Sequence, residues 1–191
     1  MNLASFAELA VRLVNSRVCD PGADPLRSCA AFREFVADRP FLAVPVTQYE
    51  LDRLKQLRTE LGGVFCDVVN GRLSAAVERL NTLMMIHPVQ PVLVTHDGEP
   101  LHLHLAENGS VTDRYAATSV ISLALLLRQY GAERLGICAI ASCDLVFIDG
   151  SSNRSRRYCA DHSAARSNVT ALAYRGDRSA DQAGTVTSAV S

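Results

Sequence analysis

The chain has 191 residues, with 19 basic and 20 acidic side chains, and 48 % of its residues are hydrophobic. A chain of this kind can bury a sizeable core, which excludes a wholly disordered protein, and its net charge of −1 excludes a uniformly basic nucleic-acid coat protein. No apolar run approaches the roughly 18 residues that a membrane span requires, so we expect no membrane partner.

Helical periodicity dominates the first 133 residues. Helices are predicted over about 3–14, 30–37, 48–69, 74–87 and 115–130. Thr47 and Glu50 form a capping box that opens the third of these helices. Gly62 and Gly63 predict a bend within it, because glycine is a poor helix former.

A β-hairpin is predicted between the last two helices. Residues 92–95 are rich in β-formers, 96–99 form a turn, and 101–105 alternate strictly between leucine and histidine. Residues 1–133 are therefore predicted as a mostly helical α+β lobe with a small antiparallel sheet.

The residue pattern changes at Arg134, where helical periodicity gives way to short strand-like segments. Short strands are predicted over 135–137 and 145–149, followed by a turn over 150–157 and a helix from 159 to about 175. Residues 134–175 thus form a small second module. Residues 176–191 are rich in small residues without periodicity and are predicted to be a disordered tail.

Three of the six cysteines gather in the second module. Cys138 and Cys143 are separated by four residues, Cys159 follows the second strand, and His162 lies one helical turn further on. The first eight residues lack a basic segment and carry an acid, so we expect no signal peptide and a reducing cytoplasm. This spacing favours a structural zinc site of three thiolates and one imidazole, with buried reduced cysteines as the alternative.

Short motifs in both parts of the chain resemble those of a known family. The second module resembles the CGNR-type zinc finger in Cys138-x4-Cys143, Phe147, Asp149, Asn153-Arg154, Tyr158-Cys159, Val169 and Tyr174-Arg175. The preceding part resembles the ABATE domain in Leu13-Val14-Asn15-Ser16, Leu54, Leu57-Arg58 and Leu80-Asn81. The resemblance implies a bacterial stress-induced transcriptional regulator with a ligand-sensing lobe and a zinc finger that binds DNA.

The sequence departs from the CGNR signature at important positions. Ser163 stands where the family has its fourth cysteine, and Ala165 replaces the signature asparagine, whereas Arg166 is retained. A serine hydroxyl is a poor zinc ligand. Either His162 takes over as the fourth ligand, or the site is degenerate and empty.

Arginines supply the basic charge of the second part. Residues 1–133 carry a net charge of −3 and residues 134–191 a net charge of +2. The candidate DNA-binding residues are Arg154, Arg156, Arg157, Arg166 and Arg175. The alternative is a solvated turn that forms salt bridges to the acidic lobe.

The lobe has residues suited to sensing. Asn15 and Arg58 are polar positions on largely apolar helices and are the candidate binding residues for a small-molecule effector. The apolar run over 120–127 could be a core helix, a cavity wall or a homodimer interface. Because Cys159 and His162 lack an orienting partner and no phosphate-binding loop is present, we expect no enzyme.

Two functions follow from the sequence. The first is a DNA-binding regulator with a structural zinc finger and a sensing lobe. The second is a small-molecule-binding or accessory protein, in a biosynthetic pathway for example, whose degenerate finger no longer binds DNA.

Overall fold

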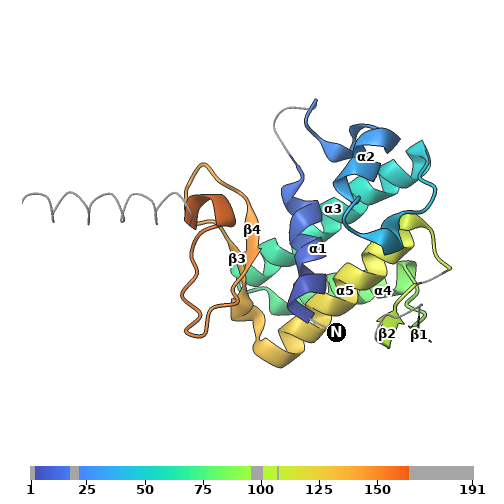
Figure 1. Ribbon diagram of the computed structural model, residues 1–191. Coiled ribbons are helices and arrows are strands. Elements are labelled where there is room, and N and C mark those ends of the chain that lie inside the picture. Colours follow the sequence, from blue (N-terminus) through green and yellow to red (C-terminus); the bar gives the residue numbers. More distant parts are fainter. Residues whose placement is uncertain (1–2, 18–21, 96–100, 107, 164–191) are drawn as a thin grey trace, which may run out of the picture.

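The computed structural model describes residues 3–17, 22–95, 101–106 and 108–163 (Figure 1). The α-helices are α1 (Leu3–Asn15), α2 (Cys29–Phe35), α3 (Gln48–Val69), α4 (Leu73–Ile86) and α5 (Val111–Tyr130). Short 3-10 helices are η1 (Pro25–Arg27), η2 (Pro40–Leu42) and η3 (Ala132–Arg134). The strands are β1 (Val92–Val94), β2 (His102–His104), β3 (Leu135–Ile137) and β4 (Val146–Ile148).

The glycine pair within α3 does not end the helix. The helix starts where expected, with the Thr47 hydroxyl accepting from the Glu50 amide, and continues through Gly62 and Gly63 to Val69. The missing side chain at Gly63 has a different use. A Cβ atom there would lie 2.7 Å from the Arg79 guanidinium carbon, so glycine lets the Arg79 side chain of α4 cross α3 closely.

The start of α5 also differs from the prediction. The helix begins at Val111, four residues before Tyr115, and the Ser110 hydroxyl accepts from the Asp113 amide as its N-cap. Apolar spacing did not predict this start, because the first turn of the helix is largely polar. The serine followed by an acidic residue at the third helical position is the signal that identifies it.

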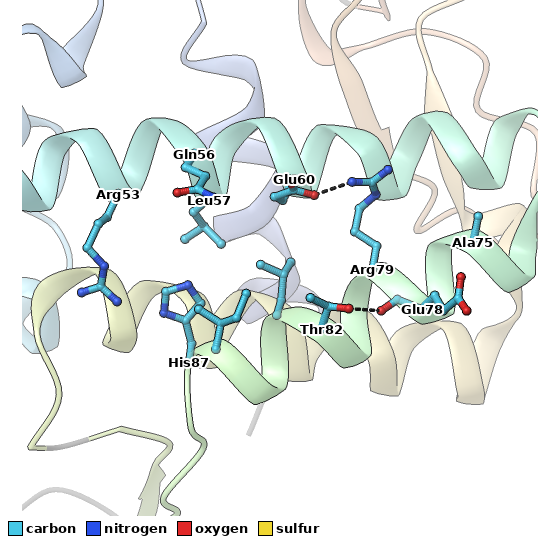
Figure 2. Close-up of a pocket in the computed structure, with 11 residues that line it drawn as sticks. Arg53, Gln56, Leu57, Glu60, Ala75, Glu78, Arg79, Thr82 and His87 are labelled. Carbon is cyan, nitrogen blue, oxygen red and sulfur yellow. Dashed lines mark hydrogen bonds and ion pairs between the residues drawn. The ribbon is translucent and has the colours of Figure 1, made fainter.

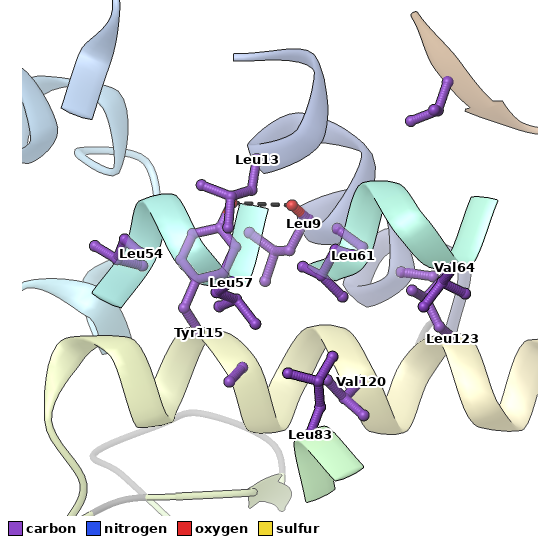
Figure 3. Close-up of a cluster of buried hydrophobic side chains, with 14 of the residues drawn as sticks. Leu9, Leu13, Leu54, Leu57, Leu61, Val64, Leu83, Tyr115, Val120 and Leu123 are labelled. Atoms are coloured by element: carbon purple, nitrogen blue, oxygen red, sulfur yellow. Dashed lines mark hydrogen bonds between the residues drawn. The ribbon is translucent and has the colours of Figure 1, made fainter. Parts of the chain in front are cut away.

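The hydrophobic core draws buried side chains from all five described α-helices. Figure 3 shows leucines of α1 and α3 packed against Tyr115, Val120 and Leu123 of α5. Tyr115 is fully buried, and its hydroxyl donates to the Leu9 carbonyl at 2.9 Å. The apolar run within α5 is therefore a core helix, which is the first of its three predicted alternatives.

The two sheets lie at opposite ends of the helical layer (Figure 1). The predicted hairpin is confirmed as β1 paired antiparallel with β2, although its turn lies outside the described residues. The second sheet pairs β3 with β4, with Ile137 opposite Val146. Leu135 and Val146 belong to the same core as the helices, so this sheet packs directly on the lobe.

The fold class is α+β, as predicted: a mostly helical lobe with a small antiparallel sheet, followed by a zinc-knuckle-like module. The predicted last helix is described only over 160–163, and the predicted tail lies outside the described residues. Within the described part of the chain, no helix has the length and apolar character needed to cross a membrane.

Candidate metal centre and the basic turn

Four predicted ligands meet in the second module. Cys138 follows β3, Cys143 lies in the loop before β4, and Cys159 and His162 flank the start of the helical turn 160–163. Their ligand atoms all lie within 4.8 Å of one another. His162 Nδ1 is 3.3 Å from the sulfurs of both Cys138 and Cys159.

The geometry and chemistry of this cluster suit zinc. With bonds of about 2.3 Å to sulfur and 2.0–2.1 Å to nitrogen, the ligand atoms of a tetrahedral zinc site lie roughly 3.5–3.8 Å apart. The four atoms lie within 4.8 Å of one another, with two nitrogen–sulfur distances of 3.3 Å, so small shifts would bring them to that separation. Three sulfurs with one imidazole are a known structural donor set. Four protein ligands close the coordination shell, so such a site leaves no position for a reacting water.

The ionisation of the thiols would be favoured by a bound cation. Burial opposes ionisation of Cys138, but the amides of Cys159 and Ile140 together with His162 lower its pKa to about 6. At Cys143 the Leu145 amide favours the thiolate, yet burial and the neighbouring sulfurs raise the pKa. Several thiolates at one point repel each other, so a bound dication stabilises the fully ionised set.

Ser163 makes a contact of another kind. Its hydroxyl donates to the Tyr158 carbonyl at 3.3 Å. The imidazole one residue earlier occupies the fourth position. The sequence left two alternatives for the missing fourth cysteine: replacement by His162 or an empty site. The structure supports replacement by His162.

The predicted basic turn uses its arginines unequally. Arg154 forms an ion pair with Glu133 and has a positive φ of 52°. Arg156 lies over the Phe147 ring and donates to the Ile148 carbonyl, at 3.2 Å, and to a second carbonyl, that of Tyr158.

Arg157 is exposed, and its side chain has no hydrogen bond or ion pair to the described residues. Arg166 and Arg175 lie outside the described residues. DNA binding by the five predicted arginines stays a prediction, in which Arg157 is the described side chain best placed for it.

Asp149 organises this turn, a role that the sequence analysis did not assign to it. The carboxylate is 3 % exposed and accepts from the amides of Ser151 and Arg156 and from the Ser151 hydroxyl. Burial opposes ionisation, but these hydrogen bonds lower the pKa of Asp149. Its signal was present in the sequence, because an aspartate two residues before a serine in a polar segment is typical of an Asx turn.

The two predicted effector-binding residues lie on helices of the lobe, and each bonds to another segment of the chain. The Asn15 amide pairs with β4, donating to the Val146 carbonyl at 2.9 Å and accepting from the Val146 amide at 2.8 Å. Arg58 makes a bidentate ion pair with Asp24, with both distances 2.9 Å. A ligand-binding role for Asn15 and Arg58 stays a prediction.

Comparison with known families agrees with this anatomy. Residues 7–135 match the model of the ABATE family, described as "Putative stress-induced transcription regulator", and residues 134–175 match the CGNR zinc finger. No curated protein matches the chain. The finger match and the assembled donor set together identify a structural zinc site at Cys138, Cys143, Cys159 and His162. The chain belongs to the ABATE family and carries a CGNR zinc finger over residues 134–175.

Proposed function

We propose that the chain is a transcriptional regulator whose zinc module contacts DNA and whose helical lobe senses a small molecule. The observation that carries the proposal is the assembled zinc module directly following an ABATE lobe. No catalytic step is part of it, because four protein ligands close the metal site.

The contact between lobe and module supports communication between sensing and DNA binding. Asn15 at the end of α1 makes two hydrogen bonds to Val146 of β4, and Leu135 of β3 is buried in the lobe's core. A ligand that shifts the helices of the lobe would therefore move the module with them.

The charges favour one residue of the described turn as a phosphate contact. Arg157 is exposed and free of described side-chain partners, whereas Arg156 packs on Phe147 and Arg154 pairs with Glu133. An unpaired guanidinium can neutralise a phosphate without first breaking an internal contact.

Mobility-shift titrations with genomic fragments at several salt concentrations test the proposal. We expect retardation that weakens with salt, and Arg157→Ala should lower the affinity about equally across fragments and reduce the salt slope by about one. Arg33→Ala is the matched control, because Arg33 is another exposed arginine, on α2 of the lobe.

The second candidate is the accessory protein that does not bind DNA. It is favoured by the internal use of Arg154 and Arg156, which removes two of the predicted DNA contacts. Absence of retardation even at low salt would overturn the regulator and select this candidate.

A further inference from the structure

A cleft of about 530 Å³ lies between α3 and α4, and the charges that line it are largely paired with one another. Figure 2 shows Arg79 reaching from α4 to Glu60 of α3, with which it forms an ion pair. Arg53, at the other end, is bonded to carboxylates as well. The chemistry that the proposed function leaves unused lies instead in the thiols of the metal site.

The three thiols of the metal site lie close enough together to react with one another. The sulfurs of Cys138, Cys143 and Cys159 are all within 4.8 Å of one another, and all three cysteines are free. Zinc binds cysteine as the thiolate, which is also the form that attacks peroxides and other sulfurs. The site can therefore be oxidised as well as hold a metal.

Exposure to solvent distinguishes one of the three sulfurs. Cys138 and Cys159 are only 6 % and 2 % exposed, whereas Cys143 is half-buried. Its neighbours Ser142 and Asp144 are exposed, so Cys143 lies in a loop that borders on water. Because oxidation of cysteine follows exposure and thiolate character, a small oxidant dissolved in water should react with Cys143 first.

The backbone favours Cys138 as the sulfur that reacts next. The Cys138 amide donates to the Leu145 carbonyl at 2.9 Å, which continues the pairing of β3 with β4. Cys143 lies in the loop between these strands, where its amide donates to the Ile140 carbonyl. A disulfide needs the two sulfurs about 2.05 Å apart, and rearrangement of this short loop can bring them together. A bridge to Cys159 would also have to move the separate segment that carries it.

We propose that hydrogen peroxide oxidises Cys143 and Cys138 to a disulfide and that zinc is thereby released. The Cys143 sulfur attacks the peroxide, so that a sulfur–oxygen bond forms, the oxygen–oxygen bond breaks and hydroxide leaves. The Cys138 sulfur then attacks the resulting sulfenic acid, so that the sulfur–sulfur bond forms and a second hydroxide leaves. Two thiolates lose two electrons in total, the peroxide gains them, and two protons from solvent convert both hydroxides to water.

Loss of two ligands accounts for the release. After oxidation the site keeps the thiol of Cys159 and the imidazole of His162, whereas a structural zinc site has four ligands. The strands that carry Leu135 and Val146 belong to the core of the lobe, so oxidation of the module should also affect the helices. The proposal rests on the zinc site and does not depend on DNA binding.

Zinc release from the zinc-loaded full chain tests the proposal, with a zinc-binding dye as the readout during titration with hydrogen peroxide. We expect about one zinc ion released per chain. Dithiothreitol should reduce the disulfide, so that the chain binds added zinc again. Retention of zinc under peroxide that already oxidises the exposed thiol of Cys66 would overturn the proposal, as would a release that dithiothreitol does not reverse.

Peptide mapping after oxidation identifies the bridge. Cleavage after arginine places Cys138 and Cys143 together in peptide 135–154 and Cys159 in peptide 158–166. The proposed disulfide therefore removes two hydrogens from the first peptide and leaves the second peptide separate. A cross-link between the two peptides, or sulfinic acid in place of a disulfide, would reject the proposed pair.

Two substitutions test the role of the exposed sulfur. Cys143→His keeps a zinc ligand at this position and removes the sulfur, so release of zinc by peroxide should be about tenfold slower. Cys66→Ser is the matched control, because Cys66 is an exposed thiol on α3 outside the metal site, and it should leave the rate unchanged. Equal rates for the natural and Cys143→His proteins would contradict the proposal.

Peptide mapping of the natural chain keeps the test decisive if the Cys143→His protein does not hold zinc. Zinc release with a bridge between Cys138 and Cys143, but without DNA retardation, would keep this proposal and reject the regulator. DNA retardation by a chain that retains its zinc in peroxide would do the opposite.

Discussion

At the scale of single residues, the fourth metal ligand lies one residue before the position at which the family has its cysteine. His162 supplies Nδ1 to the sulfur cluster, while the neighbouring Ser163 hydroxyl donates to the Tyr158 carbonyl. We therefore predict that His162→Ala lowers the zinc content well below about one ion per chain, whereas Ser163→Ala keeps it. Atomic emission spectrometry of the purified proteins measures both. Loss of zinc in the serine variant alone would contradict this assignment.

Arg156 is a second residue whose role is structural. Its guanidinium carbon lies 5.0 Å from the centre of the Phe147 ring, and its nitrogens donate to two backbone carbonyls. The ring also approaches Gly136 so closely that a Cβ atom there would clash with it. Removing the guanidinium takes one donor from each of these carbonyls and the cation from the ring.

We predict that Arg156→Ala lowers the free energy of unfolding by about 1–3 kcal/mol, from lost hydrogen bonds and cation–π contact. Arg157→Ala should change it by less than about 0.5 kcal/mol, because that side chain is exposed. Urea unfolding of the zinc-loaded proteins compares the two. Equal effects of the two substitutions would show that Arg156 has no special structural role.

At the scale of elements, one side chain joins α1 to β4. The Asn15 amide makes two hydrogen bonds to Val146 and so replaces a neighbouring strand at that edge. We predict that Asn15→Ala costs about 1–3 kcal/mol and speeds hydrogen exchange at the Val146 amide. Asn81→Ala, at an exposed position of α4, should do neither.

A polar network joins the start of α3 to the start of α5. Glu50 accepts from the Thr112 amide at 3.2 Å, from the Thr112 hydroxyl and from Arg53 at 3.1 Å. Burial opposes ionisation of Glu50, but these hydrogen bonds outweigh it and lower its pKa. Ionised Glu50 therefore stabilises the folded state above the ordinary pKa of a glutamate, and this contribution disappears as the pH falls through the lowered value.

We predict that Glu50→Gln is less stable than the natural protein near neutral pH and that the difference shrinks below a pH of about 4. Melting temperatures across the pH range measure it. Zinc release in acid affects both proteins, so it cancels in the comparison. A difference that stays constant with pH would mean that the charge of Glu50 contributes nothing.

At the scale of the whole molecule, local patterns in the sequence were more informative than distant contacts. Apolar spacing predicted the helices apart from the first turn of α5, and the spacing of the three clustered cysteines, with His162 one helical turn after Cys159, predicted the zinc ligands. The pairing of Asn15 with Val146 joins positions 131 residues apart, and no local pattern encodes it. The stacking of Arg156 on Phe147 was missed for a related reason, since it depends on how the turn folds back over β4.

The same distant contacts connect the metal to the stability of the lobe. Leu135 and Val146 belong to the lobe's core, and the strands that carry them lead directly to Cys138 and Cys143. Without zinc, the metal site contains either thiolates that repel one another or protonated thiols. The ligands then no longer hold the module together. Because the core is shared, loosening of the module should also weaken the packing of the helices.

We therefore predict that a chelator lowers the melting temperature of the whole chain, as followed by far-ultraviolet circular dichroism, which reports on the helices. The His162→Ala protein is the control: it should melt at the lower temperature from the start and respond little to chelator. If the module were independent, chelation would leave the melting of the helices unchanged. A shared shift instead means that zinc binding contributes to the free energy of folding of the helical lobe.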